Sequence, residues 1–332
     1  MSTRRGLAIS CAAAVTLATD AHAQRAAGGR WMYVSAEAAK AVSVVDLQAG
    51  AVVTTIAVGE RPRGIRASRD GRTVWVALSD ASPNVQSGSD AIVAIDVATR
   101  RVVARYPAGT DPEQFAVTSD GRWMYAANED AGTASATDLR SGKVVSTLVV
   151  GIEPEGVAVS PDDRWIYVTA ETSNTVSVID VRAQQVAAAF MVDARPRAVA
   201  FAPDGARAYV TAEIGGTVTA IDARTHRVLR SAVLENGAGK PVGVVASPDG
   251  RRIYVANGAA SVVSVLDART LRPLGRVPVG RRPWGIAVSP DGRRVYTANG
   301  LSNDVSVIDA ATLKVVATIP VAARPWGIAI VP

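Results

Sequence analysis

Charged and aromatic residues flank seven prolines that recur along the 332-residue chain. Two of these prolines, Pro283 and Pro325, are each preceded by an arginine and followed by a tryptophan. An indole face beside a guanidinium group suits a planar anionic ligand. The sequence therefore predicts a binding face for a small ligand or a partner loop, with these candidate residues: Arg63, Glu113, Glu155, Glu171, Arg197, Glu213, Arg282, Trp284, Arg324 and Trp326.

Carboxylates near the same prolines allow two other interpretations. Ca²⁺ prefers carboxylate oxygens, and four glutamates are candidate ligands if they converge across one channel: Glu37, Glu129, Glu171 and Glu213. Charged loop residues also often pair with each other, which would join neighbouring repeat units without any ligand. Both interpretations stay open beside the ligand-binding one.

Several kinds of catalysis are excluded by residue type. The only cysteine is Cys11, and the two histidines are His22 and His226. If the N-terminal segment is removed, the mature chain has no disulfide, no thiolate nucleophile and no haem-attachment motif. One remaining histidine cannot build a histidine-rich zinc site, and no Ser-His-Asp triad is recognisable. The sequence assigns no catalytic residue and favours a role other than catalysis.

A sevenfold repeat must position these residues. An aspartate closes a short apolar run of the Ser-Val-Ile-Asp type at intervals of 42 to 50 residues, at Asp46, Asp96, Asp138, Asp180, Asp222, Asp267 and Asp309. A period of roughly 40–45 residues with four strand-like runs is typical of a β-propeller blade. We expect an all-β, seven-bladed propeller in which these aspartates cap strand ends on the face away from the binding loops.

The last full unit shows the expected blade. It contains apolar runs at Gly285–Val288, Arg294–Thr297, Val305–Asp309 and Lys314–Ile319, with a Ser-Pro-Asp-Gly turn after the first. Val and Ile dominate these runs, which predicts four β-strands packed on both faces. The second run of each unit has an aromatic residue that we expect to pack between blades: Tyr33, Trp75, Tyr125, Tyr167, Tyr209, Tyr254 and Tyr296.

The two ends of the repeat predict how the ring closes. The first unit lacks its leading strand, and the chain ends on a spare copy of it, Gly327–Ile330. We expect the C-terminal strand to complete the first blade, which removes an open sheet edge. The prolines then lie where each outer strand leads to the next inner strand, at the mouth of a central channel. This mouth has an acidic sector in blades three to five between basic sectors. Extra residues at Ser79–Ser89 and Leu234–Gly239 are expected on the same face.

The N-terminus predicts export. Arg4 and Arg5 precede an apolar stretch, Leu7–Leu17, and the small-x-small sequence Ala21-His22-Ala23 follows. We interpret residues 1–23 as a signal peptide for the general secretory route, with twin-arginine export as the alternative. Residues 24–332 are then one propeller domain, periplasmic or secreted, monomeric and without a membrane span. The net charge of +6 is spread along the chain, so nucleic acid is not an expected partner.

The repeat resembles the YVTN family of β-propellers. Its pattern is Pro-x-Gly-Ile-Ala-Val-Ser-Pro-Asp-Gly, then Tyr-Val-x-Asn, then Val-Ser-Val-Ile-Asp. Trp284–Asp309 matches this pattern almost throughout, and the resemblance extends over Arg30–Pro332. Other segments are similar to β-propeller proteins associated with catabolism that depends on pyrroloquinoline quinone (PQQ): Asp111–Phe115, Asn128–Asp130, Glu153–Gly156, Thr169–Thr172, Ala212–Val218 and Asn299–Val305. This resemblance implies a periplasmic protein that accompanies quinoprotein alcohol oxidation, with no established catalytic role.

The chain departs from that resemblance in the insertion around Pro83 and in the link before Pro241. No residue set resembles the PQQ site of the quinoprotein dehydrogenases themselves. We therefore expect a non-catalytic binding or accessory protein, with a quinoprotein dehydrogenase or a small anion as its partner and with PQQ or Ca²⁺ as the associated cofactor, if there is one. One alternative is a lactonase-like hydrolase or lyase that uses a channel metal and carboxylates. The other alternative is a cell-surface scaffold.

Overall fold

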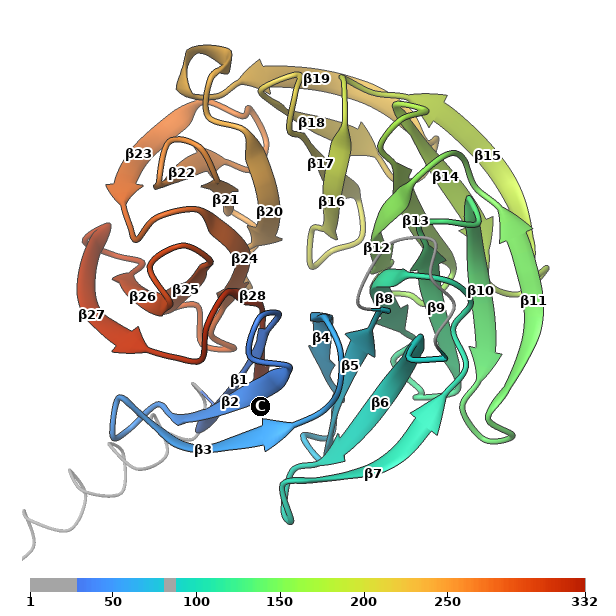
Figure 1. The fold of residues 1–332 in the computed structure, drawn as a ribbon. Helices are drawn as coiled ribbons and strands as arrows, with labels where there is room; N and C mark the ends of the chain where they lie inside the picture. Colours follow the sequence, from blue (N-terminus) through green and yellow to red (C-terminus); the bar gives the residue numbers. More distant parts are fainter. Residues whose placement is uncertain (1–28, 81–87, 332) are drawn as a thin grey trace, which may run out of the picture.

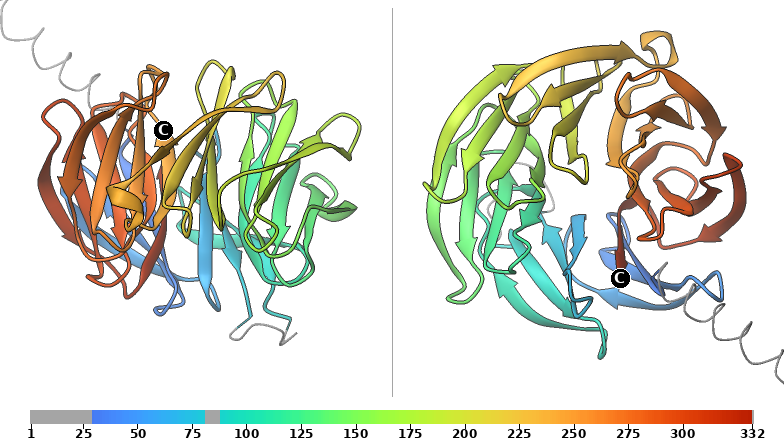
Figure 2. Two further views of the ribbon diagram at one scale, coloured as in Figure 1. Left: turned by 90° about the horizontal axis from the view of Figure 1, so that it is seen from above. Right: turned by 180° about the vertical axis from the view of Figure 1, so that it is seen from behind.

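The computed structural model describes residues 29–80 and 88–331, which form a ring of seven four-stranded antiparallel sheets around a central channel (Figure 1). The predicted seven-bladed propeller is therefore confirmed. The side view shows the blades standing next to one another around the channel axis (Figure 2). The expected signal peptide at residues 1–23 lies outside the described residues, as does Pro83 in the first insertion.

Each innermost strand begins at one of the seven prolines. These strands lie nearest the channel in Figure 1 and are β4 (Pro62–Ala67), β8 (Pro112–Val117), β12 (Pro154–Val159), β16 (Pro196–Phe201), β20 (Pro241–Ala246), β24 (Pro283–Val288) and β28 (Pro325–Val331). Proline lacks a backbone N–H, so it suits the first position of a strand.

The second strands have the expected aromatic residue at their third position. They are β1 (Trp31–Ala36), β5 (Thr73–Leu78), β9 (Trp123–Asn128), β13 (Trp165–Ala170), β17 (Arg207–Ala212), β21 (Arg252–Asn257) and β25 (Arg294–Asn299). Two of the tyrosine hydroxyls bond to the next blade: the Gln184 Nε2 donates to the Tyr125 hydroxyl at 2.5 Å, and the Tyr167 hydroxyl lies 2.7 Å from His226 Nδ1. Trp75 packs in the core with Phe115 of the next blade. The aromatic residues therefore pack blade against blade, as predicted.

The third strands are almost entirely buried and end on the repeated aspartate: β2 (Ala41–Asp46), β6 (Ala91–Asp96), β10 (Thr133–Asp138), β14 (Thr175–Asp180), β18 (Thr217–Asp222), β22 (Val262–Asp267) and β26 (Asp304–Asp309). The Asp138 Oδ1 accepts hydrogen bonds from the backbone N–H groups of Arg140 at 2.8 Å and Ser141 at 3.1 Å, and the other six aspartates accept equivalent bonds. These aspartates cap strand ends, and in the last blade Asp309 pairs in register with Arg294, beside the Ser-Pro-Asp-Gly turn.

The outer strands lie on the rim of the ring and are largely exposed: β3 (Ala51–Ala57), β7 (Arg101–Tyr106), β11 (Lys143–Val149), β15 (Gln185–Met191), β19 (Arg227–Val233), β23 (Pro273–Pro278) and β27 (Lys314–Pro320). A short 3-10 turn, η1 (Glu235–Gly237), precedes β20 at the second insertion. No helix in the described residues is long and apolar enough to cross a membrane.

Ring closure occurs as predicted. The last strand, β28, pairs antiparallel with β1, with Trp31 opposite Val331 and Val34 opposite Ile328. The Ser35 hydroxyl accepts a hydrogen bond from the Gly327 N–H at 2.9 Å and donates to the Arg63 carbonyl at 2.6 Å. This hydroxyl therefore links β28 to the first two blades of the chain.

Candidate functional site

The residue before each proline has an unusual backbone. All seven are charged, and all have a positive φ between 38° and 61°: Arg61, Asp111, Glu153, Arg195, Lys240, Arg282 and Arg324. This left-handed region is unfavourable for non-glycine residues, and it persists only where surrounding structure enforces it. Hydrogen bonds enforce it here, since the carbonyls of Glu153 and Arg282 accept the N–H groups of Glu171 at 2.9 Å and Gly300 at 2.9 Å. The chain segment at each proline therefore has a fixed backbone, which holds its side chains in a defined direction.

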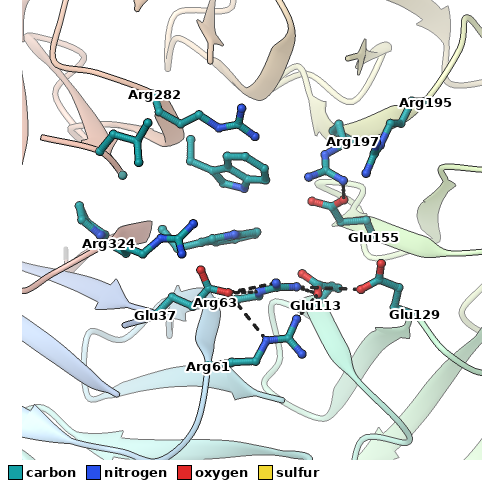
Figure 3. Close-up of a pocket in the computed structure, with 15 residues that line it drawn as sticks. Glu37, Arg61, Arg63, Glu113, Glu129, Glu155, Arg195, Arg197, Arg282 and Arg324 are labelled. Carbon is teal, nitrogen blue, oxygen red and sulfur yellow. Dashed lines mark hydrogen bonds and ion pairs between the residues drawn. The ribbon is translucent and has the colours of Figure 1, made fainter. Parts of the chain in front are cut away.

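A cavity of about 570 Å³ lies at the proline end of the channel. We call it the mouth cavity. Figure 3 shows Arg282 and Arg324 on one side and Glu113, Glu129 and Glu155 on the other. Eight residues of the predicted binding face line this cavity: Arg63, Glu113, Glu155, Arg197, Arg282, Trp284, Arg324 and Trp326.

The other two predicted residues lie behind the cavity wall and hold its arginines. Arg197 Nη1 contacts Glu155 at 2.5 Å and also contacts Glu171, and Arg197 Nε lies 3.5 Å from Glu213. Arg195 Nε lies 2.6 Å from Glu171 and 3.5 Å from Glu213. Glu171 and Glu213 are buried, so each neutralises arginines that would otherwise lose hydration without compensation.

A second network joins blades one to three. Arg63 Nη2 lies 3.0 Å from Glu37 and its Nη1 contacts Glu113, while Arg61 Nη1 lies 3.2 Å from Asp111. Arg61 also approaches Glu37 at 3.7 Å. Much of the charge at the mouth is therefore internally paired, as the interpretation without a ligand expected.

The two tryptophans form the aromatic part of the mouth. Their ring centroids are 6.0 Å apart with an interplanar angle of 42°. The guanidinium groups of Arg197 and Arg282 lie 4.9 Å and 4.8 Å from the centroid of Trp284. Arg324 is exposed and has no carboxylate partner among residues 29–80 and 88–331. This side of the cavity therefore offers an aromatic surface beside one uncompensated positive charge.

Two glutamates of the mouth cavity, Glu129 and Glu155, have raised pKa values. Burial, together with the nearby Glu155 and Asp111 carboxylates, raises the pKa of Glu129 to about 7 against the opposing effect of Arg63 and Arg197. Burial also raises the pKa of Glu155, against the opposing effect of Arg197. Because Glu129 changes charge near neutral pH, it can accept or release a proton in the cavity.

The four glutamates predicted as metal ligands do not converge on one point. In the part of the chain that the structure describes, the carboxylates that come together are Asp111, Glu113 and Glu129, with ligand oxygens within 4.8 Å of one another. Two neighbouring arginines already pair with this group. Glu37 pairs with Arg63, whereas Glu171 and Glu213 lie on Arg195 and Arg197. Arginines on both sides of the acidic blades, such as Arg63 and Arg197, lie between the predicted ligands and pair with them.

Our sequence-based list of site residues omitted Arg61 and Arg195, which also line the mouth cavity. Both precede a proline, at the same position as Arg282 and Arg324, so the repeat register contained the signal. The second insertion, Leu234–Gly239, contributes no lining residue; its Glu235 turns outward to Arg276 at 2.7 Å.

Comparison with known proteins supports the fold and adds a partial family match. Residues 188–315 match the family model of the seven-bladed β-propeller lactonases, and residues 42–192 match the Choice-of-anchor I domain. Each match covers less than half of the chain. No curated protein is similar enough to the chain to count as a match.

Several solved structures have the same architecture. Hydrazine synthase from Kuenenia stuttgartiensis is 23% identical with a TM-score of 0.76, over 86% of this chain and 94% of that one. A putative 6-phosphogluconolactonase from Bacteroides fragilis is 19% identical with a TM-score of 0.75, over 91% and 97% of the two chains. A functionally unknown protein from Desulfotomaculum acetoxidans is 19% identical with a TM-score of 0.77, over 91% and 98%. At these identities the likeness shows the fold alone.

Proposed function

We propose that the protein is a periplasmic or secreted binding protein whose mouth cavity takes a small, flat anion. One observation carries this proposal: the Trp284–Trp326 pair lies beside Arg282 and near an Arg324 that no described carboxylate neutralises. A flat anion can stack on an indole face and accept charge-assisted hydrogen bonds from guanidinium groups. The match to the Choice-of-anchor I model supports a location outside the cytoplasm.

PQQ is the ligand that we propose to test first. It is a flat conjugated molecule with several carboxyl groups, which fits an aromatic and arginine-rich wall. The sequence resemblance to proteins associated with PQQ-dependent catabolism points to the same ligand, or to a quinoprotein dehydrogenase that carries it. In this role the protein would serve quinoprotein alcohol oxidation as an accessory and would not itself oxidise the alcohol.

Titration with PQQ tests this proposal. The double variant Trp284→Ala, Trp326→Ala removes the stacking surface, so we expect PQQ affinity to fall at least roughly tenfold, since stacked aromatic and cation–π contacts each contribute about 1 kcal/mol or more. Calorimetry measures the affinity, and circular dichroism checks that the propeller remains folded.

Trp123→Ala is the matched control, because Trp123 stacks with Arg122 and does not line the mouth cavity. Equal PQQ affinity in the control, the double variant and the wild type would remove the mouth cavity as the site. No detectable PQQ binding to the wild type would count against the ligand itself.

A second candidate function is lactone hydrolysis. Glu129, with its pKa of about 7, faces a cavity rich in guanidinium groups, and residues 188–315 match the lactonase model. In this reaction the Glu129 carboxylate would take a proton from water as the water oxygen attacks the lactone carbonyl, and the protonated Glu129 would return that proton to the ring oxygen as the ring C–O bond breaks. An arginine would stabilise the negative charge on the carbonyl oxygen in the transition state.

Hydrolysis assays with gluconolactone and its 6-phosphate distinguish this function from ligand binding alone. If Glu129 is the base, the rate should rise with pH through about 7, because only the ionised carboxylate accepts a proton. Glu129→Gln should lose about 100-fold or more in kcat. A wild-type protein that hydrolyses neither lactone would exclude this reaction for these substrates.

A further inference from the structure

Further along the inner strands, the channel contains a second cavity of about 60 Å³. We call it the lower cavity. Arg66 and Gln114 line it, together with the inner-strand glycines of blades one, six and seven. Four side chains line both this cavity and the mouth cavity, namely Glu155, Arg197, Trp284 and Trp326. A ligand at the mouth is therefore adjacent to the lower cavity.

Arg66 and Gln114 are both exceptions to the repeat. The position of Arg66, four residues after the proline, is occupied in the other blades by Ala116, Ala158, Ala200, Val245, Ala287 and Ala329. The position of Gln114 is glycine in five blades and alanine in one. The two exceptions come from neighbouring blades and meet, since Arg66 Nη2 donates to the Gln114 Oε1 at 3.1 Å. The fold itself does not need either side chain, as the remaining blades demonstrate.

The hydrogen bonds of Arg66 leave its charge uncompensated. Its guanidinium donates to the Ile65 carbonyl at 3.0 Å and to Gln114, and both acceptors are neutral. Within residues 29–80 and 88–331, no carboxylate forms an ion pair with Arg66, in contrast to Arg61, Arg63, Arg195, Arg197 and Arg282 in the mouth cavity. Loss of hydration inside the channel lowers the pKa of Arg66, but an arginine stays protonated at neutral pH.

Arg66 is half-buried, and a positive charge partly removed from water without a counter-charge is destabilising. The lower cavity has space for an anionic group that would supply the missing counter-charge. A cavity of about 60 Å³ has room for ordered water or for one group of carboxylate size. With its Oε1 engaged by Arg66, Gln114 retains its amide N–H groups as further donors to such a group.

We propose that Arg66 and Gln114 form an anion subsite that binds one carboxylate of a ligand whose flat body lies against Trp284 and Trp326. The ligand is then a small molecule with at least two acidic groups, one at Arg66 and one at the exposed Arg324 side of the mouth. This inference rests on the proposed function for its mouth part, whereas the Arg66 subsite stands on its own contacts.

Formate tests the subsite by itself, because it is a bare carboxylate small enough for the lower cavity. We expect formate, at constant ionic strength, to raise the Tm of the wild type and of Arg324→Gln but not of Arg66→Met. Methionine keeps much of the apolar volume of the arginine stem and removes the charge. Without formate, Arg66→Met should therefore be at least as stable as the wild type.

Two results would overturn the subsite. One is an equal formate-induced shift in Arg66→Met and in the wild type. The other is a marked loss of stability in Arg66→Met, which would show that the charge of Arg66 is already compensated within the fold. Arg66→Lys keeps the positive charge, so it should retain part of the formate-induced shift.

PQQ then tests whether the two sites act on one ligand. Removal of the Arg66 charge should weaken PQQ binding roughly tenfold or more, through loss of a charge-assisted hydrogen bond. Equal PQQ affinity in Arg66→Met and in the wild type would contradict a ligand that spans both cavities. The proposal that PQQ binds in the mouth cavity would remain. Conversely, a wild type that responds to formate but does not bind PQQ would retain the subsite and reject PQQ as the ligand.

Discussion

At the scale of single residues, protonation and pairing decide what the mouth can do. The buried Glu171 and Glu213 are acceptors for arginines, and their role is to position Arg195 and Arg197. Glu129 differs, because its distance from Arg63 is 3.9 Å and other carboxylates lie close to it. Its raised pKa means that the ionised Glu129 carboxylate destabilises the folded state and that protonation of Glu129 removes this destabilisation.

Glu129 should make stability depend on pH in an unusual direction. Its pKa rises on folding from near 4.5 to about 7, so between these values the folded state binds more protons than the unfolded state. The free energy of unfolding therefore falls as the pH rises through this window, by up to about 3 kcal/mol for this group. Glu129→Gln lacks this contribution. The Tm of the variant relative to the wild type should therefore increase between about pH 5 and about pH 8, which span most of this window.

Thermal unfolding across this pH range measures the effect. Glu60→Gln is the control, because Glu60 lies in the peripheral pair with Lys40. A Tm difference between Glu129→Gln and wild type that does not change with pH would contradict the raised pKa of Glu129.

At the scale of elements, the inner strands place the site. Each begins at a proline that follows a residue held at a positive φ, and in four blades both neighbours of this proline line the mouth cavity, as Arg282 and Trp284 do. The strands also pack very closely: a Cβ at Gly156 would lie 2.3 Å from the carbonyl oxygen of Arg197. Small residues at this position bring neighbouring strands together, which narrows the channel and brings side chains of six blades together at the mouth cavity.

At the scale of the whole molecule, closure of the ring holds the two tryptophans together. Trp284 belongs to β24 and Trp326 to β28, and β28 is fixed in place by its pairing with β1. The first and last parts of the chain therefore build one wall of the site jointly. Any loss of closure should affect stability and ligand binding together.

Removal of the last six residues, 327–332, tests this dependence. The truncation deletes most of β28, exposes the edge of β1 and uncovers apolar residues that pack against Ile328, such as the fully buried Val34. We expect a loss of several kcal/mol in the free energy of unfolding and a lower Tm, from lost strand pairing and apolar burial. Removal of Pro332 alone is the control. An unchanged Tm in the six-residue truncation would contradict the observed closure.

The seven-bladed architecture could be predicted from the repeat, since the aspartates, prolines and aromatic residues follow local rules of strands and turns that act within one blade. The register beside the prolines also predicted one face for the eight of the ten binding residues that line the mouth cavity. Which charges are neutralised is visible only in the folded ring, because partners such as Arg197 and Glu171 come from different blades and lie 26 residues apart in the chain. For the same reason the separation of the predicted metal ligands, the raised pKa of Glu129 and the uncompensated charge of Arg66 became visible only in the closed ring.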